Sequence, residues 1–323
     1  MTIDKRPEIA IGCHPLEAGR YLLATNEINR LREEVIKWIE NRTPGAIVYG
    51  RPRLGKSRAI KYLQYDLPEV FGGKLPIFQV RCLQYKNLNE GVFFGDLLKD
   101  VGHMEYLSGK PEVKRDRLIK FLLERGRVSG QHRIILFLDD SQRLHEFQYG
   151  WLMDIYNELD QFGICLTVIL VGQEELIHQR TAFKQSKKTQ IIGRFMIHEY
   201  QFMGIKTLED IKSCLAGYDC NCEYPAGSGW SFTRYFFPDA YTLGYRLENS
   251  ADEVFKAFTT LRQAVKMLSP MEIPMQYLTL TVEYAFRKFG TNGLNVEWLN
   301  QANWIEAIEN SGYIKAESYQ EVI

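Results

Sequence analysis

The feature that most constrains this chain is a glycine-rich stretch at residues 45–57, GAIVYGRPRLGKS. A short apolar run stops at Gly50, and Gly55, Lys56 and Ser57 follow in the pattern G-x-x-x-x-G-K-[ST]. The glycines permit backbone angles at which successive N–H groups turn inward onto phosphate oxygens. The lysine reaches the terminal phosphates, and the serine hydroxyl ligates Mg²⁺. The stretch therefore predicts a site for a nucleoside triphosphate, ATP or GTP, with Mg²⁺.

The residues around this stretch have the periodicity that such a motif requires. An apolar run precedes it, and Arg58-Ala59-Ile60-Lys61-Tyr62-Leu63 follows with apolar residues at helical spacing, so the order is strand, loop, helix. The positive end of that helix would point at the phosphates. A surface turn with a solvated lysine is the alternative, and the flanking pattern argues against it. We expect nucleotide contacts from Gly50, Arg51, Pro52, Arg53, Leu54, Gly55, Lys56, Ser57 and Arg58.

Length and composition set the broad class. A chain of 323 residues can form one large core with a smaller satellite, or two domains. Its apolar content of 45% and charged content of 25% are typical of a globular protein in water. No apolar stretch approaches the ~20 residues of a membrane span, and the N-terminal MTIDKRPEIAIGCHP lacks the apolar core of a signal peptide. We therefore expect a cytoplasmic protein with no membrane partner.

The cysteines and the net charge add little. The pair Cys220 and Cys222 has only Cys214 as a nearby candidate for a shared metal, and this spacing favours free thiols. Cys82 and Cys165 fall in expected strands, where they would be buried. Forty basic residues balance forty acidic ones, so only a local cluster can argue for a nucleic-acid partner.

Strand and helix patterns alternate along the first part of the chain. Beyond the strand and helix of the motif, we expect strands at 75–82, 131–140, 164–171 and 195–200, and helices at 25–41, 89–101, 112–127, 151–162 and 174–183. This alternation predicts a parallel sheet covered on both faces. Later patterns are helical, at 206–218, 241–249, 251–268, 275–289 and 296–309, and the aromatic segment 230–237 could be extended.

These patterns divide the chain into an irregular arm at 1–24, an α/β nucleotide-binding domain at 25–204, a helical lid at 205–268 and a helical tail at 269–323. Trp298 and Trp304 of the tail are expected to lie in a core, as large aromatic residues usually do.

A second motif ends the apolar strand Ile134-Ile135-Leu136-Phe137-Leu138, which runs into Asp139 and Asp140. A carboxylate at the end of a buried parallel strand lies where ligands collect. Asp139 would hold Mg²⁺, mainly through water, and Asp140 would orient or deprotonate the attacking water. An ordinary strand-to-loop carboxylate is the alternative. Because Asp is one methylene shorter than a Glu at the second position, we expect slow hydrolysis.

Three further polar residues complete the predicted site. Gln173 follows the strand at 164–171 and would sense the γ-phosphate. Arg194, in IIGRF, would reach a neighbouring subunit's nucleotide and neutralise developing charge. Arg246, at the start of the helix expected at 241–249, would fold back onto the phosphates. Taken alone, each is equally well explained as a solvated or salt-bridged polar residue.

Together the glycine-rich loop, the DD strand end, the G-Q strand end, G-R-F and the later G-Y-R resemble an AAA+ ATPase over residues 25–265. VILVGQEEL followed by IIGRF is similar to the TnsC/TniB group, the ATPase regulators of Tn7-like transposons, with IstB-type and MuB-type proteins as more distant kin. The group usually has VGQPEL and DE where this chain has VGQEEL and DD; the second departure bears on hydrolysis.

The resemblance implies an AAA+ αβα sandwich with a central parallel sheet and a smaller C-terminal helical lid. It also implies ATP-dependent homo-oligomers, rings or helical filaments, on double-stranded DNA. Such a protein would link a target-selection protein to the transposase of a Tn7-like transposon, CRISPR-associated transposons among them.

A local excess of positive charge is compatible with a DNA partner. Residues 110–133 hold eight basic and three acidic side chains, a net charge of +5, and phosphate contact needs such an excess. Lys110, Lys114, Arg115 and Arg117 are the candidate contacts, and charge reversal at Lys114 and Arg115 should weaken DNA binding about equally across sequences. A solvated helix face is the alternative.

Two other functions stay open from the sequence. A replication-type helicase loader would bind a helicase and prefer single strands. A small-molecule kinase would need a closed acceptor pocket and no subunit arginine, so that Arg194→Ala would leave its activity intact.

Overall fold

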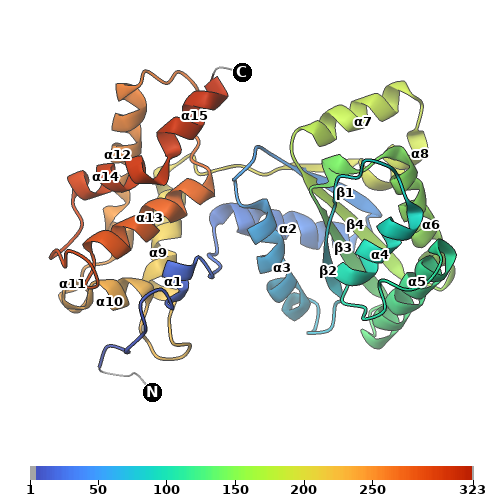
Figure 1. The fold of residues 1–323 in the computed structure, drawn as a ribbon, viewed down its shortest axis with the longest axis horizontal. Coiled ribbons are helices and arrows are strands. Elements are labelled where there is room, and N and C mark those ends of the chain that lie inside the picture. The colour runs from blue at the N-terminus through green and yellow to red at the C-terminus, as the bar shows by residue number, and fades with distance from the viewer. Residues whose placement is uncertain (1–4, 322–323) are drawn as a thin grey trace. The chain divides into compact units, whose positions relative to one another are not determined.

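The computed structural model of the protein describes residues 5–321, which form two compact units. One unit contains residues 30–52 and 56–202, and the other contains the described residues up to 29, residues 53–55 and those from 203 onward. We call them the α/β unit and the helical unit (Figure 1).

A five-stranded parallel sheet organises the α/β unit, in the order β2-β3-β4-β1-β5. β3 lies between β2 and β4 and is apolar on both faces, as a central strand covered by two layers must be. The strands are β1 (Gly45–Tyr49), β2 (Ile77–Arg81), β3 (Arg133–Asp139), β4 (Cys165–Gly172) and β5 (His198–Gln201).

Helices cover both faces of this sheet. Alternate residues of β3, Ile134, Leu136 and Leu138, join one core cluster with α4, α5 and α6. Ile135 and Phe137 point the other way and are equally buried, on the face that α2 and α3 cover (Figure 1). The helices are α2 (Asn26–Glu40), α3 (Lys56–Val70), α4 (Glu90–Asp100), α5 (Pro111–Val128), α6 (Glu146–Gln161), α7 (Glu175–Gln185) and α8 (Thr189–Phe195). The predicted parallel αβα architecture is confirmed.

Two element starts in this unit differ from the sequence prediction by three residues or more. α6 begins at Glu146, well before the expected residue 151, because Gln148 reaches back and accepts the N–H of His145 at 2.9 Å. Arg194 and Phe195 were placed next to or in a strand at 195–200, but they end the helix α8, and β5 starts only at His198. Ile191 and Phe195 are buried while Gly193 between them is exposed, which is a helical and not a strand period.

The helical unit holds the remaining elements. They are α1 (Pro15–Ala18), α9 (Leu208–Cys220), α10 (Phe232–Phe236), α11 (Pro238–Thr242), the 3₁₀ turn η2 (Leu247–Ser250), α12 (Ala251–Ala264), α13 (Met275–Phe289), α14 (Gln301–Ser311) and α15 (Tyr313–Glu321). A second 3₁₀ turn, η1 (Ser141–Arg143), belongs to the α/β unit. α13 has the bounds that the sequence predicts.

Two segments of this unit were predicted wrongly, and the helix expected at 296–309 begins only at Gln301. The stretch 230–237 is not extended, because the Ser231 side chain accepts the N–H of Arg234 and starts α10. The helix expected at 241–249 does not form. Gly244 has φ of 94°, which ends α11, and the buried Asp219 carboxylate then accepts the N–H groups of Leu247 and Glu248 at 2.9 and 3.0 Å.

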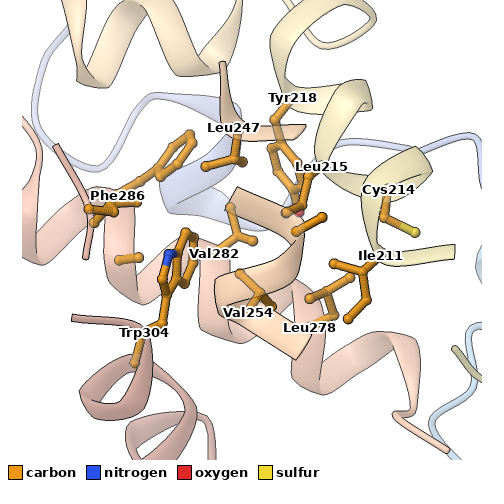
Figure 2. Close-up of a cluster of buried hydrophobic side chains, with 14 of the residues drawn as sticks. Ile211, Cys214, Leu215, Tyr218, Leu247, Val254, Leu278, Val282, Phe286 and Trp304 are labelled. Carbon is orange, nitrogen blue, oxygen red and sulfur yellow. The ribbon is translucent and has the colours of Figure 1, made fainter. Parts of the chain in front are cut away.

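Residues 205–268 and 269–323, a lid and a tail by sequence, contribute to one hydrophobic core as far as they are described. Figure 2 shows side chains of α9, η2, α12, α13 and α14 meeting there. Trp304 is fully buried, as predicted, and Trp298 packs at the edge against Phe237 and Tyr245.

His14 anchors the N-terminal arm, of which the structure describes residues 5–24. His14 is fully buried among Phe232, Tyr235 and Phe236, with ring centroids 4.6–5.0 Å away. Its Nδ1 accepts the N–H of Leu16 at 3.2 Å, which caps α1. Burial lowers the pKa of His14 to about 4. None of the helices in residues 5–321 is long and apolar enough to cross a membrane.

Candidate nucleotide-binding site

The register of the sheet gathers the predicted motifs at one edge. Asp139, the last residue of β3, lies opposite Val171 of β4, and Gly172 lies opposite Tyr49, the last residue of β1. The loop after Tyr49, the residue after Gly172 and the Asp139–Asp140 pair therefore share the carboxyl edge of the sheet. Open parallel sheets bind their ligands at this edge.

Lys56 is the charged centre of the glycine-rich loop. It opens α3 directly after the loop that follows β1, so the strand–loop–helix order holds. Its Nζ donates to the carbonyl oxygens of Gly50 and Arg51, both at 2.7 Å. Burial lowers the pKa of Lys56 to about 8, although the carboxylates of Asp139 and Asp140 oppose that shift. The ammonium is thus only partly compensated by neutral carbonyls, and an anion at this position would complete its coordination.

The middle of the loop is grouped with the helical unit. Gly55 has φ of 107°, a conformation that favours glycine. Arg53 has φ of 66° and donates from its guanidinium to the Tyr277 hydroxyl, while its carbonyl accepts the N–H of Gln276 at 3.2 Å. Leu54 is buried. Pro52 and Arg53 are exposed, and the nucleotide contacts predicted for them and for Leu54 remain predictions.

The oxygen donors expected for Mg²⁺ are present. Ser57 is exposed in the first turn of α3, and Arg58 beside it is exposed as well. Asp139 accepts the Gln79 side-chain amide and the Asp140 N–H, both at 3.1 Å, which fixes its carboxylate at the strand end. A hydroxyl and a carboxylate are the hard donors that Mg²⁺ prefers. Ser57 and Asp139 would hold the ion, which neutralises phosphate charge when bound.

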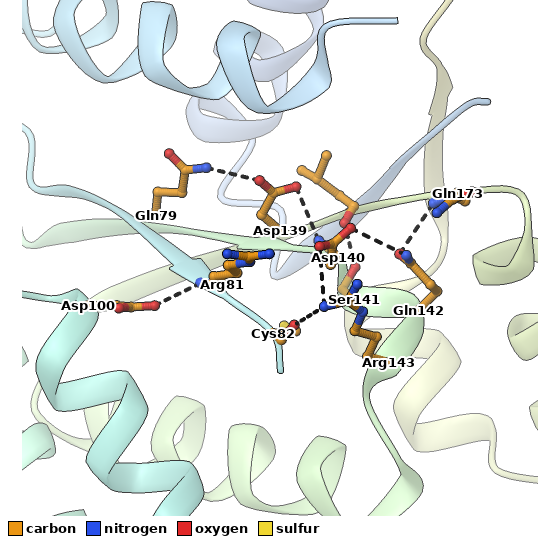
Figure 3. Close-up of polar contacts among 11 residues, drawn as sticks. Gln79, Arg81, Cys82, Asp100, Asp139, Asp140, Ser141, Gln142, Arg143 and Gln173 are labelled. Carbon is orange, nitrogen blue, oxygen red and sulfur yellow. Dashed lines mark hydrogen bonds and ion pairs between the residues drawn. The ribbon is translucent and has the colours of Figure 1, made fainter. Parts of the chain in front are cut away.

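Asp140 is held in an unusual conformation by residues outside the predicted motifs. Its φ and ψ are 58° and 35°, in the left-handed region. Its Oδ1 accepts the Gln142 side-chain amide at 3.4 Å, and its Oδ2 lies 3.5 Å from the Arg143 guanidinium. Figure 3 shows these side chains converging on Asp140. The run D-D-S-Q-R itself was the available signal, because polar side chains that close a turn beside two carboxylates must lie near them.

Gln173 reaches this network through its backbone. Its N–H donates to Gln142 Oε1 at 3.3 Å (Figure 3). A Cβ at Gly172 would stand 2.2 Å from the same oxygen, so the glycine makes room for Gln142. Gln142 therefore links the predicted water-orienting residue to the predicted phosphate sensor.

Arg194 does not join this group. A Cβ at Gly45, the first residue of β1, would meet the Arg194 carbonyl at 3.0 Å, so Arg194 lies by the amino edge of the sheet. At the rise of a β-strand, the far end of β1 is about 13 Å away. The Arg194 guanidinium lies 4.4 Å from the Tyr156 ring and donates to Asn157.

Arg246 belongs to the helical unit and lies between α11 and η2, not at the start of a helix. Its guanidinium stacks 3.7 Å from the Tyr241 ring and donates to the carbonyls of Tyr241 and Tyr245, at 2.9 and 2.6 Å. The Asp219 carboxylate accepts the N–H groups of Leu247 and Glu248, the two residues that follow Arg246. The predicted contact of Arg246 with phosphate stays a prediction.

The basic segment is less positive than its sequence suggests. Lys114 donates to the Gly91 carbonyl at 3.1 Å. Arg115 pairs with Glu90 and Asp154, and Arg117 with Glu105, at 3.4–3.7 Å. These three carboxylates lie outside residues 110–133, so they offset charge that the sequence count leaves uncompensated. Lys110 is exposed.

All six cysteines are free, and the described residues contain no cluster of His, Cys, Asp and Glu that could hold a metal ion.

Comparisons with known proteins agree with this geometry. Residues 40–180 match the family described as an AAA domain. The fold is similar to that of the Aeropyrum pernix ORC2 protein in its ADPNP–ADP complexes, with a TM-score of 0.54, 12% identity, and coverage of 92% of this chain and 71% of that one. It is also similar to a Walker-type ATPase of Pyrococcus abyssi, with a TM-score of 0.51, 14% identity, and coverage of 94% and 76%. No curated protein matches the sequence. Residues 40–180 thus match an AAA domain, and the chain has the α/β P-loop AAA+ fold.

Proposed function

We propose that this chain, with its AAA domain at residues 40–180, is an ATP-dependent DNA-binding regulator of Tn7-like transposition. It would oligomerise on duplex DNA and connect a target-selection protein with a transposase. The resemblance of VILVGQEEL and IIGRF to the TnsC/TniB group supports the transposition part of this proposal.

The placement of Arg194 is the observation that carries the assembly part. The triphosphate would be held at the carboxyl edge of the sheet by Lys56, Ser57 and Asp139, with Asp140 beside it. Arg194 lies by the opposite edge, next to Gly45. An arginine there is too far from the site of its own subunit, so a catalytic role for it requires a second copy of the chain.

The partly compensated ammonium of Lys56 supports ATP as the ligand. Two carbonyls at 2.7 Å are its contacts in the loop, and a phosphate oxygen would replace neutral acceptors by a charged one. Binding would then be coupled to assembly, because the same phosphates would face the arginine of the neighbouring subunit. Hydrolysis, with Asp140 held away from an ordinary backbone conformation, would be slow.

The test is electron microscopy of the purified chain with duplex DNA and a slowly hydrolysed ATP analogue. We expect rings or filaments for the wild type and none for Lys56→Ala. Arg194→Ala should bind the nucleotide normally but fail to assemble. Arg180→Ala is the matched control, since Arg180 is another arginine of the α/β unit and pairs with Glu199 at 2.6 Å.

Other outcomes would contradict the proposal. A chain that stays monomeric with every nucleotide would overturn the assembly part. A preference for single strands, with capture of a helicase, would indicate a helicase loader. Unchanged nucleotide turnover in Arg194→Ala without any assembly would favour a kinase.

A further inference from the structure

We propose that Arg143 and Gln142 are positioning residues that hold Asp140 in a resting arrangement, from which it must be released before ATP is hydrolysed. This inference rests on the proposed ATPase function and adds the device that restrains it. It concerns residues outside the two nucleotide-binding motifs.

The first observation is the direction in which Arg143 draws Asp140. Arg143 Nη1 lies 3.3 Å from the carbonyl oxygen of Cys82 and 3.5 Å from Asp140 Oδ2. Cys82 follows β2, and its N–H is bonded to the Asp139 carbonyl at 2.8 Å. β2 lies on the side of β3 away from β4 and β1. One oxygen of Asp140 is therefore tied toward the sheet edge that is farther from the glycine-rich loop.

The second observation is the position of Gln142. Its amide nitrogen donates to Asp140 Oδ1 at 3.4 Å, and its oxygen accepts the N–H of Gln173 at 3.3 Å. The Gln142 side chain thus fills the place between Asp140 and the end of β4 (Figure 3). A water molecule in contact with both Asp140 and Gln173 would need this place.

The third observation is the backbone of Asp140 itself. Residues with a side chain rarely adopt φ of 58°, although Asp and Asn do so more readily than most. Such strain persists only where the surroundings hold it, and it collects at functional sites. The turn is held because Arg143 N–H donates to the Asp140 carbonyl at 3.1 Å and the Ser141 hydroxyl donates to the Val171 carbonyl at 3.0 Å. The shorter Asp in place of Glu suits this conformation.

These contacts define a restraint that is weak enough to open. The Arg143 and Asp140 side chains are 35% and 32% exposed, and such an ion pair contributes about 0.2–1 kcal/mol. At 1.36 kcal/mol per factor of ten, its removal would raise the hydrolysis rate up to about fivefold. The affinity for the nucleotide would stay unchanged, because Arg143 faces Asp140 and the end of β2.

The experiment compares single-turnover hydrolysis of saturating Mg²⁺-ATP by the full chain and by Arg143→Ala, together with the affinity for a fluorescent ATP analogue. We expect Arg143→Ala to hydrolyse about 1.4- to fivefold faster at equal affinity, and Arg143→Lys to fall between the wild type and Arg143→Ala. Gln142→Ala should also accelerate hydrolysis. In an Asp140→Asn background, which keeps a residue that tolerates the left-handed conformation, Arg143→Ala should have no effect.

The control is Arg32→Ala, which breaks the Arg32–Asp66 pair of the same unit, whose side chains are 31% and 26% exposed. It should leave the rate unchanged, and thermal unfolding of each variant checks folding. A rate that falls or stays constant in both Arg143→Ala and Arg143→Lys overturns the inference while leaving the ATPase function intact. A wild type that binds no ATP analogue overturns the proposed function, and the inference with it.

Discussion

The carboxyl edge of the sheet and the junction of α12 with α15 each hold a cation that is partly or fully buried. The two cations differ in how completely the surrounding groups compensate their charge. Lys56 faces carbonyl oxygens and has a lowered pKa. Arg262, 5% exposed, contacts the Tyr313 hydroxyl at 2.9 Å, the Ser269 hydroxyl at 3.0 Å and the carboxylate of Glu317 at 3.9 Å. A charge that is saturated by its surroundings serves stability, whereas one that is partly compensated is available for a ligand.

The largest expected effect is on the saturated cation. Arg262→Ala would leave the Glu317 carboxylate, 4% exposed, without this partner, and breaking a buried pair costs about 3–5 kcal/mol. We expect that loss in the free energy of unfolding by urea. The double variant Arg262→Met with Glu317→Leu should recover most of it, because it removes both charges. A loss below about 1 kcal/mol for the single variant would show that the pair does not hold α15.

His14 lies between Lys56 and Arg262 in this comparison, because it is a buried base that stays neutral at pH 7. Its folded pKa of about 4 lies below the ordinary 6.5, so the unfolded chain binds the proton more readily. The free energy of unfolding should therefore be constant above pH 6.5 and fall by about 3 kcal/mol as the pH decreases to 4. The variant His14→Asn keeps a side-chain acceptor for the Leu16 N–H and cannot titrate. Urea unfolding measures the free energy of unfolding of the wild type and of His14→Asn across this pH range. If the two proteins show the same dependence on pH, His14 is not the titrating group.

Lys56 should affect binding and not stability. Lys56→Met would remove a charged hydrogen bond to phosphate, worth about 1.5–3 kcal/mol, and weaken the affinity for ATP by about 10- to 150-fold. The free energy of unfolding at pH 7 should not decrease, because a partly buried charge disappears. Isothermal titration and urea unfolding measure the two effects, and a variant destabilised as strongly as Arg262→Ala would erase the contrast between the regions.

The same lysine predicts a pH limit for the wild type. Because its pKa is lowered to about 8, ATP affinity should decline as the pH rises through 8, well below the range in which an exposed lysine titrates. Lys56→Met should show no such decline. An affinity that is level up to pH 9.5 in the wild type would contradict the assignment.

The smallest effect concerns an exposed cation. Lys110→Gln should weaken duplex binding modestly and reduce the slope of log K against log salt by about 0.9, the loss of one phosphate contact. Lys114→Gln should change the slope less, because Lys114 already donates to Gly91. Fluorescence anisotropy over a salt series measures both. Equal slopes for the wild type and Lys110→Gln would remove this lysine from the DNA surface.

Local patterns predicted most of the fold. The all-apolar β3 and the amphipathic α13 follow from periodicity within one segment. The errors arose where a distant residue decided the backbone. The segment after Gly244 is not helical, because the N–H groups of Leu247 and Glu248 donate to Asp219. The helix α8 forms because Phe195 is buried in the core beside β1.

By itself, the sequence determined that a glycine-rich loop precedes a helix and that two carboxylates end a buried strand, because each is built from contiguous residues. Only the tertiary structure decided that Gln142 connects Asp140 with Gln173 and that Arg143 connects it with Cys82. It also decided that Arg194 lies by the opposite edge of the sheet, and that Arg115 and Arg117 are already paired. These facts depend on which strands are neighbours and which side chains face each other across them, and no spacing along the chain encodes that.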